Sequence, residues 1–407
     1  MTGDDTGTTA APTRETPTRR ALLGAGATAG AGLLAGCTDS LVGTGGSGDP
    51  TASPTDSSYT VSMAPVGQVA FDAVPEDVMV YSLLYADMAV AFGHGDAVNS
   101  LGFDAAAGGN TLDAYYERLP GVSFEYEDLT QLNSGSGDIR VDQELLYELD
   151  SDLHLADPCL FRSFDGWGAA DIEAIREQVG PWFGNVYSRN HGQPPEGCRE
   201  GYEYYTLPEL AGRVGAVFRE SERAAALQSV REDLLATIED GLPPEDERPT
   251  VGAVIFSQGT FYPSNINSTG FANAHVRPLG AVDAFDDVDY DTTYGYEGLL
   301  EIDPDVILHQ FGIASYYDVG SIRETVANDE VGAELAAIRN DRFYPSGTPT
   351  QGPLMNLFQL EMTAKQLYPE QFGAWPGYEA GAPYPELPEG ERLFDRERVA
   401  SIVRGEP

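Results

Sequence analysis

The sequence contains very little positive charge. Of its 407 residues only 23 are Lys or Arg, against 65 Asp or Glu, so the formal net charge is -42, and Lys365 is the one lysine. Such a surface repels the phosphates of nucleic acids and anionic lipid headgroups, which argues against nucleic-acid binding. Concentrated salt tolerates this charge, because the Debye length falls to about 3 Å at 1 M ionic strength. The charge therefore indicates a halophilic environment and says little about function.

Cysteine and histidine are also scarce, with three Cys and five His. There is no CxxC or HxH motif and no pair of histidines four residues apart, which argues against a metal ion held directly by protein side chains. Cys159 and Cys198 both lie in loop-like sequence, and outside the cell an even pair could form a disulfide. The sequence leaves open whether they do.

Three catalytic signatures are absent as well: the GxSxG nucleophile elbow, HExxH and the phosphate-binding loop. Each of them carries a chemical step that a hydrolase or a nucleotide-dependent enzyme needs. We therefore expect no enzymatic activity and no cofactor.

The first 58 residues predict an export signal and a tether. Arg19 and Arg20 precede a run of small and apolar residues that ends at Cys37 and is too short for a transmembrane helix of about 20 residues. The residues before Cys37 resemble a lipobox, which predicts a twin-arginine lipoprotein signal over 1–37 and lipidation of Cys37. The alternative is a chance cysteine behind an ordinary signal peptide. Residues 38–58, rich in Gly, Ser, Thr and Pro, predict a disordered linker.

A twelve-residue segment occurs twice, at 144–155 and 297–308, with six identical positions. Each copy predicts a short helix, an acidic turn and a buried parallel strand. Strands and helices alternate around both copies, which indicates parallel sheets covered by helices on both faces. The chain therefore has two similar halves, and the predicted fold class is α/β with two Rossmann-like lobes, at 59–205 and 248–400.

The segment between the lobes predicts a helix. Thr206 and Glu209 form a capping box with proline in the first turn, and apolar residues recur at helical spacing as far as Gly241. A single helix of about 33 residues would be about 50 Å long at 1.5 Å per residue. We expect this segment, 206–241, to be a rigid connector between the lobes.

Between residues 70 and 375 the chain resembles the iron-siderophore and cobalamin family of ABC-transporter solute-binding proteins, class III, of haloarchaeal type. The resemblance rests on the order of several motifs: the start of the first lobe at 74–78, the Gly-x-Gly-Asp turn at 93–96, the two repeat copies, the middle helix, and the segments 338–344 and 367–372. It implies two α/β lobes joined by one helix, a ligand in the cleft between them, and only a small closure of that cleft.

In this family one surface glutamate on each lobe docks onto arginines of the permease dimer. The matching residues are Glu144 and Glu297, each the first residue of its repeat copy. Two equivalent carboxylates suit a partner with twofold symmetry. The alternative is that both are solvated glutamates favoured by the helix dipole.

We expect the ligand beyond the carboxyl ends of the strands, as in other doubly wound lobes. Aromatic residues with a few of the scarce arginines there suit a large, chelated and partly anionic ligand. The alternative is that each aromatic side chain packs its own loop. Adjacent tyrosines at 316–317 resemble the pairs that bind bare ferric ion in a different fold group, and we favour a chelated ion. The candidates are Tyr81, Tyr85, Phe161, Arg162, Trp167 and Arg189 in lobe one, and Tyr262, Asn265, Arg277, Phe311, Tyr316 and Tyr317 in lobe two.

The sequence thus predicts a monomeric, lipid-anchored binding protein on the outer face of the cell membrane that delivers its ligand to an ABC permease. An iron(III)-siderophore is preferred over a corrinoid such as cobalamin, or haem, because of its frequency in the family and not because of any residue. Two alternatives from other classes are a lipid-tethered secreted hydrolase and a surface adhesion domain.

Overall fold

The computed structural model describes residues 58–102, 110–133, 140–286, 288, 292–314 and 316–406. The predicted signal, most of the linker and Cys37 lie outside these residues. Within the described ranges, every helix is too short or too polar to cross a bilayer.

Lobe one contains a parallel sheet preceded by a hairpin. Strands β1 (Tyr59–Met63) and β2 (Gly67–Phe71) pair antiparallel, and the sequence did not predict them. The parallel sheet has the order β5-β4-β3-β6. Trp182 adds one isolated parallel bridge, to His154 of β6. The sheet consists of β3 (Val78–Val80), β4 (Val98–Leu101), β5 (Thr130–Gln131) and β6 (Leu153–Leu155).

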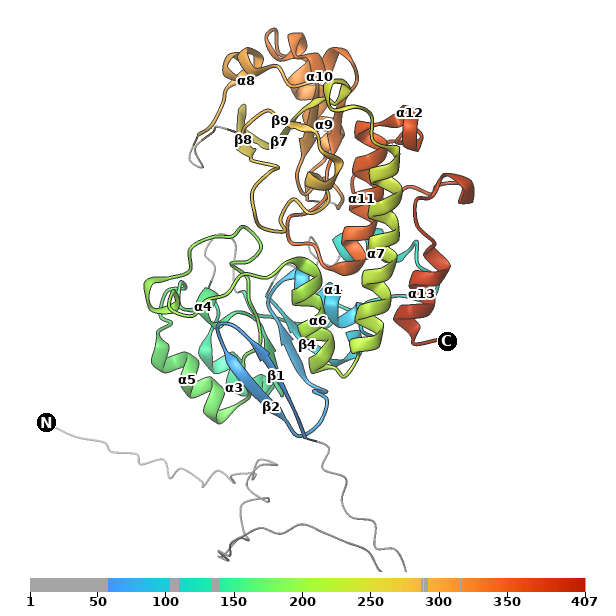
Figure 1. Cartoon of the computed structure of the whole chain (residues 1–407). Helices are drawn as coiled ribbons and strands as arrows, with labels where there is room; N and C mark the ends of the chain where they lie inside the picture. The colour runs from blue at the N-terminus through green and yellow to red at the C-terminus, as the bar shows by residue number, and fades with distance from the viewer. Residues whose placement is uncertain are drawn as a thin grey trace, which may run out of the picture. The chain divides into compact units, whose positions relative to one another are not determined.

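Helices cover both faces of this sheet (Figure 1). Val78 and Val80 of β3 belong to the main core, together with side chains of α1 (Leu83–Ala91) and α6 (Leu207–Val217). Met79, which points to the opposite face, belongs to a second core. That second core also contains side chains of α3 (Gln143–Leu149), α4 (Pro158–Phe161) and α5 (Ala169–Gln178).

Lobe two repeats this plan. Its sheet has the order β11-β10-β7-β8, with β9 against β7, and all pairs are parallel except β7 with β8. Strand β8 contains Pro263 and lies in a segment rich in Gly, Asn, Ser and Tyr, so the sequence did not predict it. The strands are β7 (Thr250–Ser257), β8 (Thr260–Ser264), β9 (Val282–Asp283), β10 (Val306–His309) and β11 (Phe343–Pro345), and the helices of the outer face are α8 (Tyr296–Ile302), α9 (Val319–Ala327) and α10 (Ala336–Arg339).

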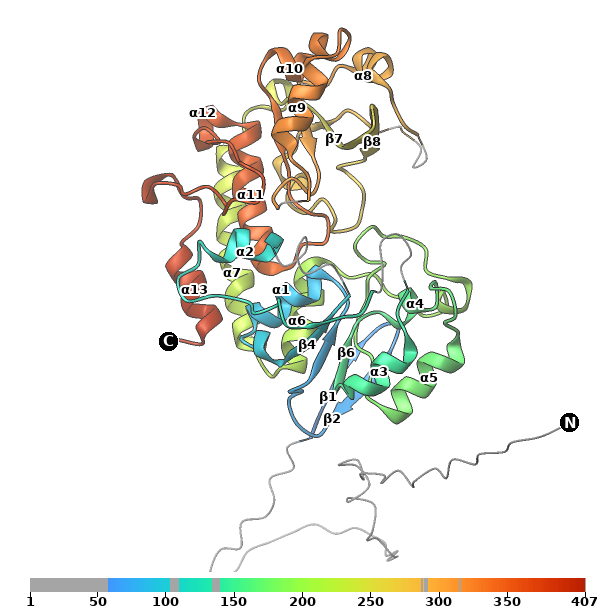
Figure 2. The ribbon, with the colours of Figure 1, turned by 180° about the vertical axis from the view of Figure 1, so that it is seen from behind.

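The predicted connecting helix is two helices. The capping box of Thr206 and Glu209 starts α6 as expected, but α6 ends at Val217 and α7 runs over Ser221–Gly241. Arg219 has a φ of 59°, the amide of Arg219 donates to Ala216, and the amide of Glu220 donates to Gly215 at 2.7 Å. These bonds form a Schellman motif, which usually has glycine where Arg219 stands. The prediction of one continuous helix was therefore wrong, and α7 alone is the long connecting helix (Figure 2).

Helix α11 (Pro353–Leu367) packs beside α7 and is buried along nearly its whole length. Its first turn is held by lobe one: Asp87 of α1 accepts hydrogen bonds from the amide of Leu354 at 2.9 Å and from the hydroxyl of Tyr116, in α2 (Asn110–Tyr116), at 2.8 Å. The main core therefore continues through both lobes. The chain ends with α12 (Pro369–Phe372) and α13 (Arg396–Arg404).

Candidate functional site

The two repeat copies have the same local structure. Each forms a seven-residue helix, α3 or α8, whose inward leucine is fully buried, Leu146 in one and Leu299 in the other. Both helices end at an aspartate with left-handed backbone geometry, Asp150 with a φ of 47° and Asp303 with a φ of 46°. Aspartate tolerates this conformation better than most residues, which explains its presence at both ends.

A second aspartate in each copy binds the start of the neighbouring strand. Asp152 accepts hydrogen bonds from the amides of Glu76 and Asp77, at 3.1 and 3.2 Å. Asp305 accepts hydrogen bonds from the amide and the hydroxyl of Thr250, at 2.8 and 2.7 Å. These bonds satisfy backbone groups where β3 and β7 begin.

Two glutamate pairs of the repeat remain without such a role. Glu144 and Glu148 on α3, and Glu297 and Glu301 on α8, are exposed. Among the described residues, none of these four carboxylates takes part in a hydrogen bond or an ion pair. Hydrogen bonds and burial account for the aspartates and leucines of the repeat. Glu144 and Glu297 lie in the first turns of α3 and α8, where the helix dipole favours a carboxylate but no hydrogen bond among the described residues holds it.

Three of the predicted ligand residues of lobe one are core residues. Tyr85, Phe161 and Trp167 are 1, 0 and 7% exposed. The hydroxyl of Tyr85 accepts a hydrogen bond from the amide of Asn185, and Trp167 donates its indole N–H to the carbonyl of Val141 at 2.8 Å. Their polar atoms are therefore used within the protein, and in this structure these side chains pack the lobe.

Two other candidates of lobe one are only partly buried. The ring of Tyr81 packs against Phe161 with 5.0 Å between centroids, and its hydroxyl donates to the side chain of Asn133. Arg162 donates from Nη1 to the carbonyl of Gly197 at 2.9 Å and contacts the sulfur of Cys198. Cys198 is bonded to Cys159 in a disulfide. Arg162 thus holds the disulfide-closed loop.

The backbone of Arg189 contacts lobe two. Its carbonyl oxygen accepts a hydrogen bond from the amide of Ala272 at 2.8 Å. Gly270 lies so close that a Cβ there would overlap the same oxygen. Arg277 donates from Nη1 to the carbonyls of Ser268 and Gly270, which fixes this loop of lobe two. The structure therefore joins two predicted candidates, Arg189 and Arg277, through one interlobe contact.

A strip of aromatic rings, which the sequence did not predict as a set, lies next to this contact. His191 stacks on Tyr204 at 3.9 Å, Tyr204 packs on Tyr202 at 5.5 Å, and Tyr202 packs on Tyr187 at 5.8 Å. Tyr204 is 36% exposed. The density of tyrosine at 202–205 was the signal that could have revealed it. We call these four residues the aromatic strip.

The buried side chain of Asp157 holds the aromatic strip through Tyr202. Its Oδ2 accepts hydrogen bonds from the hydroxyl of Tyr202 at 2.5 Å and from the amide of Val186 at 2.9 Å. Burial raises the pKa of Asp157 to about 6, although these hydrogen bonds favour the ionised form. This carboxylate therefore positions the strip and is itself inaccessible to a ligand.

The candidates of lobe two lie on strand β8 and in the segments that follow β8 and β10. Tyr262 on β8 is 47% exposed, and Tyr316 is 64% exposed beside Tyr317. Asn265 is occupied by backbone groups, since its side chain donates to Asp286 and accepts from the amide of Asn267. Phe311 is half-buried with a φ of 57°. The exposed tyrosines are free to contact a ligand, whereas Asn265 shapes its own loop.

The histidine at the end of β10, His309, is structural. Nε2 of His309 accepts a hydrogen bond from the amide of Phe256, and Nδ1 of the same ring lies at hydrogen-bond distance from the carbonyl of Gln310. Burial lowers the pKa of His309. Throughout the described part of the chain, no three His, Cys, Asp or Glu side chains come together as a metal site.

No family model matches the sequence, and no curated protein matches it. Solved structures do match the fold. A periplasmic binding protein from Veillonella parvula has a TM-score of 0.55 at 14% identity, over 81% of this chain and 95% of its own. The petrobactin-binding protein YclQ from Bacillus subtilis has a TM-score of 0.53 at 13% identity, over 76% and 99%.

A third match is the iron uptake ABC transporter substrate-binding protein PiuA from Streptococcus pneumoniae, with a TM-score of 0.51 at 15% identity, over 74% of this chain and 96% of its own. At such low identity the likeness is one of fold. The chain has the two-lobed fold of periplasmic binding proteins, and the predicted fold class is confirmed.

Proposed function

We propose that this protein is the extracytoplasmic substrate-binding component of an ABC importer, which captures an iron(III)-siderophore complex between its lobes and delivers it to a membrane permease. In this proposal it is exported by the twin-arginine pathway, anchored through lipid on Cys37, and has no enzymatic activity. The fold supports a binding role, since two of its structural relatives carry iron uptake or petrobactin binding in their names.

The observation that carries the proposal is the pair of glutamates left over from the repeat. Glu144 and Glu297 occupy the same position on two equivalent helices, are exposed, and have no partner among the described residues. An exposed and unpaired carboxylate kept at the same position of both lobes suits a partner that contacts both lobes. A permease dimer presenting arginines at two related positions is such a partner.

For the ligand, we assign contact to the aromatic strip of lobe one and to Tyr262, Tyr316 and Tyr317 of lobe two. The exposed members of this set are His191, Tyr204, Tyr262 and Tyr316, and the others are partly buried. Arg189 and Arg277 remain candidates for anionic groups of a chelate, and Tyr81 and Phe311 for its apolar parts. Tyrosine rings supply a large contact area at low conformational cost. The positive charge of the arginines suits the ligand because cations are scarce in this chain.

The test is a titration of the purified chain in molar KCl with ferric hydroxamates, ferric catecholates, cobalamin and haem, followed by tryptophan fluorescence. Trp167 and Trp182 both pack on Phe161, which packs on the candidate Tyr81, so their fluorescence can report on binding at lobe one. Saturable quenching by one ferric chelate class supports the proposal and identifies the ligand. Quenching only by cobalamin or haem would show that the ligand is one of these and not a ferric siderophore. No quenching by any of them would contradict the ligand assignment.

Matched variants locate the site. Tyr204→Ala is expected to weaken binding about tenfold, because a stacked aromatic contact is lost. Tyr147→Ala is the control, since Tyr147 is 41% exposed on α3, away from the strand ends. Equal affinity of the two variants would contradict the placement of the site.

A further inference from the structure

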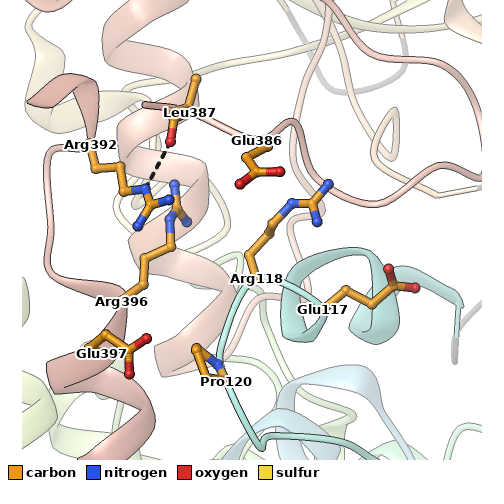
Figure 3. A pocket seen from close by; sticks show the side chains of 8 residues that line it. All are labelled: Glu117, Arg118, Pro120, Glu386, Leu387, Arg392, Arg396 and Glu397. Atoms are coloured by element: carbon orange, nitrogen blue, oxygen red, sulfur yellow. Dashed lines mark hydrogen bonds between the residues drawn. The ribbon is translucent and has the colours of Figure 1, made fainter. Parts of the chain in front are cut away.

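A pocket of about 220 Å³ lies where the C-terminal segment, residues 384–397, meets the chain that follows α2 (Figure 3). Arg118 reaches it from the segment after α2, and Arg392 and Arg396 reach it from the C-terminal segment. Three arginines in one pocket are unusual in a chain with only 23 Lys and Arg among 407 residues. The other residues that line it are Glu117, Pro120, Glu386, Leu387 and Glu397.

Arg396 is the buried member of the three. Its side chain is 4% exposed, and its guanidinium lies over the rings of Phe358 and Phe394, at 4.6 and 4.8 Å. Nη2 donates to Glu361 at 2.6 Å. Nη1 is buried and has no hydrogen-bond partner within the described structure. A buried charged donor without an acceptor is destabilising, so this atom calls for an acceptor that the protein does not supply.

Arg118 and Arg392 are held by backbone oxygens and not by carboxylates. Nε of Arg118 donates to the carbonyl of Tyr384 at 2.5 Å, and Nε of Arg392 donates to the carbonyl of Leu387 at 2.9 Å. Over the described ranges, no carboxylate lies within 4.0 Å of either guanidinium as an ion pair. Because a guanidinium has five N–H donors, both keep their terminal nitrogens for another acceptor.

We propose that this pocket binds a small oxyanion, a phosphate, sulfate or carboxylate group. The planar donors of arginine match two oxygens of such a group, and fixing both Nε atoms in advance lowers the entropy lost on binding. Glu117, Glu386 and Glu397 also line the pocket, but they are exposed and, among the described residues, none of them forms an ion pair with Arg118 or Arg392. Arg396 alone is paired, with Glu361. The site is distinct from the proposed ligand and docking residues, so it does not depend on the proposed function.

A bound oxyanion would fasten the C-terminal segment to the body of the protein. Glu361 of α11 already binds this segment through Arg396, the hydroxyl of Tyr384 at 3.0 Å and the amide of Leu393 at 2.7 Å. Arg118 adds the link to the end of α2. An anion shared by Arg118 and Arg392 would join the same elements and raise the melting temperature with its concentration.

The test measures phosphate binding to the full chain in molar KCl by isothermal titration calorimetry, with sulfate and acetate as competitors that distinguish tetrahedral from carboxylate oxyanions. The melting temperature is followed over the same titration. Saturable binding together with a saturating rise in melting temperature is expected. A rise that does not saturate, or no heat of binding, would overturn the proposal, because general salt effects do not saturate at a site.

Variants separate the pocket from general effects. Arg118→Gln and Arg392→Gln are each expected to weaken phosphate binding about tenfold, since charge-assisted hydrogen bonds are lost. Arg398→Gln is the matched control. Arg398 is exposed on α13, the helix that carries Arg396, and pairs only with Asp233 among the described residues. Binding that is equally weak in Arg398→Gln would overturn the assignment.

A gain of affinity excludes misfolding as the explanation. Glu386→Gln removes a negative charge from the pocket and is expected to tighten phosphate binding about twofold in high salt, where screening limits the effect. Unchanged or weaker binding by Glu386→Gln, with Arg118→Gln also unchanged, would contradict an oxyanion at this place.

Discussion

The two lobes share the repeat but differ in the segments beyond it. In both, a short helix ends at a left-handed aspartate and a second aspartate binds the start of the neighbouring strand. After β6 the chain of lobe one enters α4 and a disulfide-closed loop, whereas after β10 the chain of lobe two turns at Phe311. The comparison shows that the parts of a lobe fixed by backbone hydrogen bonds are kept in both copies, while the segments beyond the strands differ. Those segments carry the proposed ligand contacts.

Removing the disulfide tests the feature that lobe one has and lobe two lacks. Cys159→Ser with Cys198→Ser opens a loop of 39 residues, and the chain-entropy relation predicts a loss of about 4 kcal/mol in the free energy of unfolding. Guanidinium denaturation followed by tryptophan fluorescence measures it. Reduction of the wild-type chain should give the same loss and leave the double variant unchanged. A loss in the double variant as small as that of a surface substitution would show that the loop is held by other contacts.

Charge reversal tests whether the lobes contribute equally to docking. Glu144→Arg and Glu297→Arg are each expected to weaken binding to the proposed permease about tenfold, and together about hundredfold, because distant sites add. Uptake of the proposed ferric ligand into cells carrying each variant measures this. Glu245→Arg is the control, since Glu245 is exposed and lies outside both repeat helices. The same loss in the control would indicate a general charge effect.

Each lobe also has a buried histidine that resists protonation. Burial lowers the pKa of His154 to about 4 and that of His275 to about 3, below the ordinary 6.5. A histidine with a lowered pKa contributes stability above pH 6.5 that is lost as the pH falls. At pH 5, each of these histidines should therefore lower the free energy of unfolding by about 2 kcal/mol relative to neutral pH. Urea denaturation from pH 7.5 to 4 of His154→Gln and His275→Gln should show a shallower loss than in the wild type.

Comparison with the wild type at each pH is necessary because a buried aspartate acts in the opposite sense. Burial raises the pKa of Asp157 to about 6, so its contribution is lost as pH rises from 3.8 through that value. The histidine variants keep this contribution, and only the difference belongs to the histidine. An unchanged slope in both variants would contradict the neutral buried state.

The strand-start aspartates test the shared element itself. Asp152→Ala and Asp305→Ala should each lower the free energy of unfolding by about 1 kcal/mol, as for a lost helix cap. The loss should be larger for Asp305, whose two hydrogen bonds are shorter. Asp128→Ala is the control, since Asp128 is exposed and has no hydrogen bond within the described chain. An equally large loss in the control would contradict a stabilising role for the hydrogen bonds of Asp152 and Asp305.

The smallest effect is expected at the left-handed aspartates, where the lobes should differ in sign. Asp150→Gly relieves an unfavourable φ and should stabilise by about 0.5 kcal/mol. Asp303→Gly relieves the same strain but removes a hydrogen bond from the amide of Ala336 at 2.7 Å to its carboxylate, so it should destabilise slightly. Thermal denaturation of both variants measures the difference. Equal shifts would show that this hydrogen bond contributes nothing.

Local signals explain what could be predicted from the sequence. The repeat, the capping box at Thr206 and the buried strands depend on neighbouring residues, so their patterns are readable in the chain itself. The break at Arg219 was missed because its Schellman motif lacks the usual glycine, and β8 because its segment is rich in turn-forming residues. Cys159 and Cys198 were a possible pair whose bond depends on how their two loops are folded.

The sequence by itself determined the two α/β lobes, because alternating apolar runs and caps act over a few residues. Only the tertiary structure decided which of the predicted ligand residues are accessible. Tyr85, Phe161 and Trp167 are buried by segments distant in the chain, and Asp87 holds a helix that begins 266 residues after it, at Pro353. Arg396 came to lie in a pocket for the same reason. Burial is set by which distant segments pack together, and no local pattern records that.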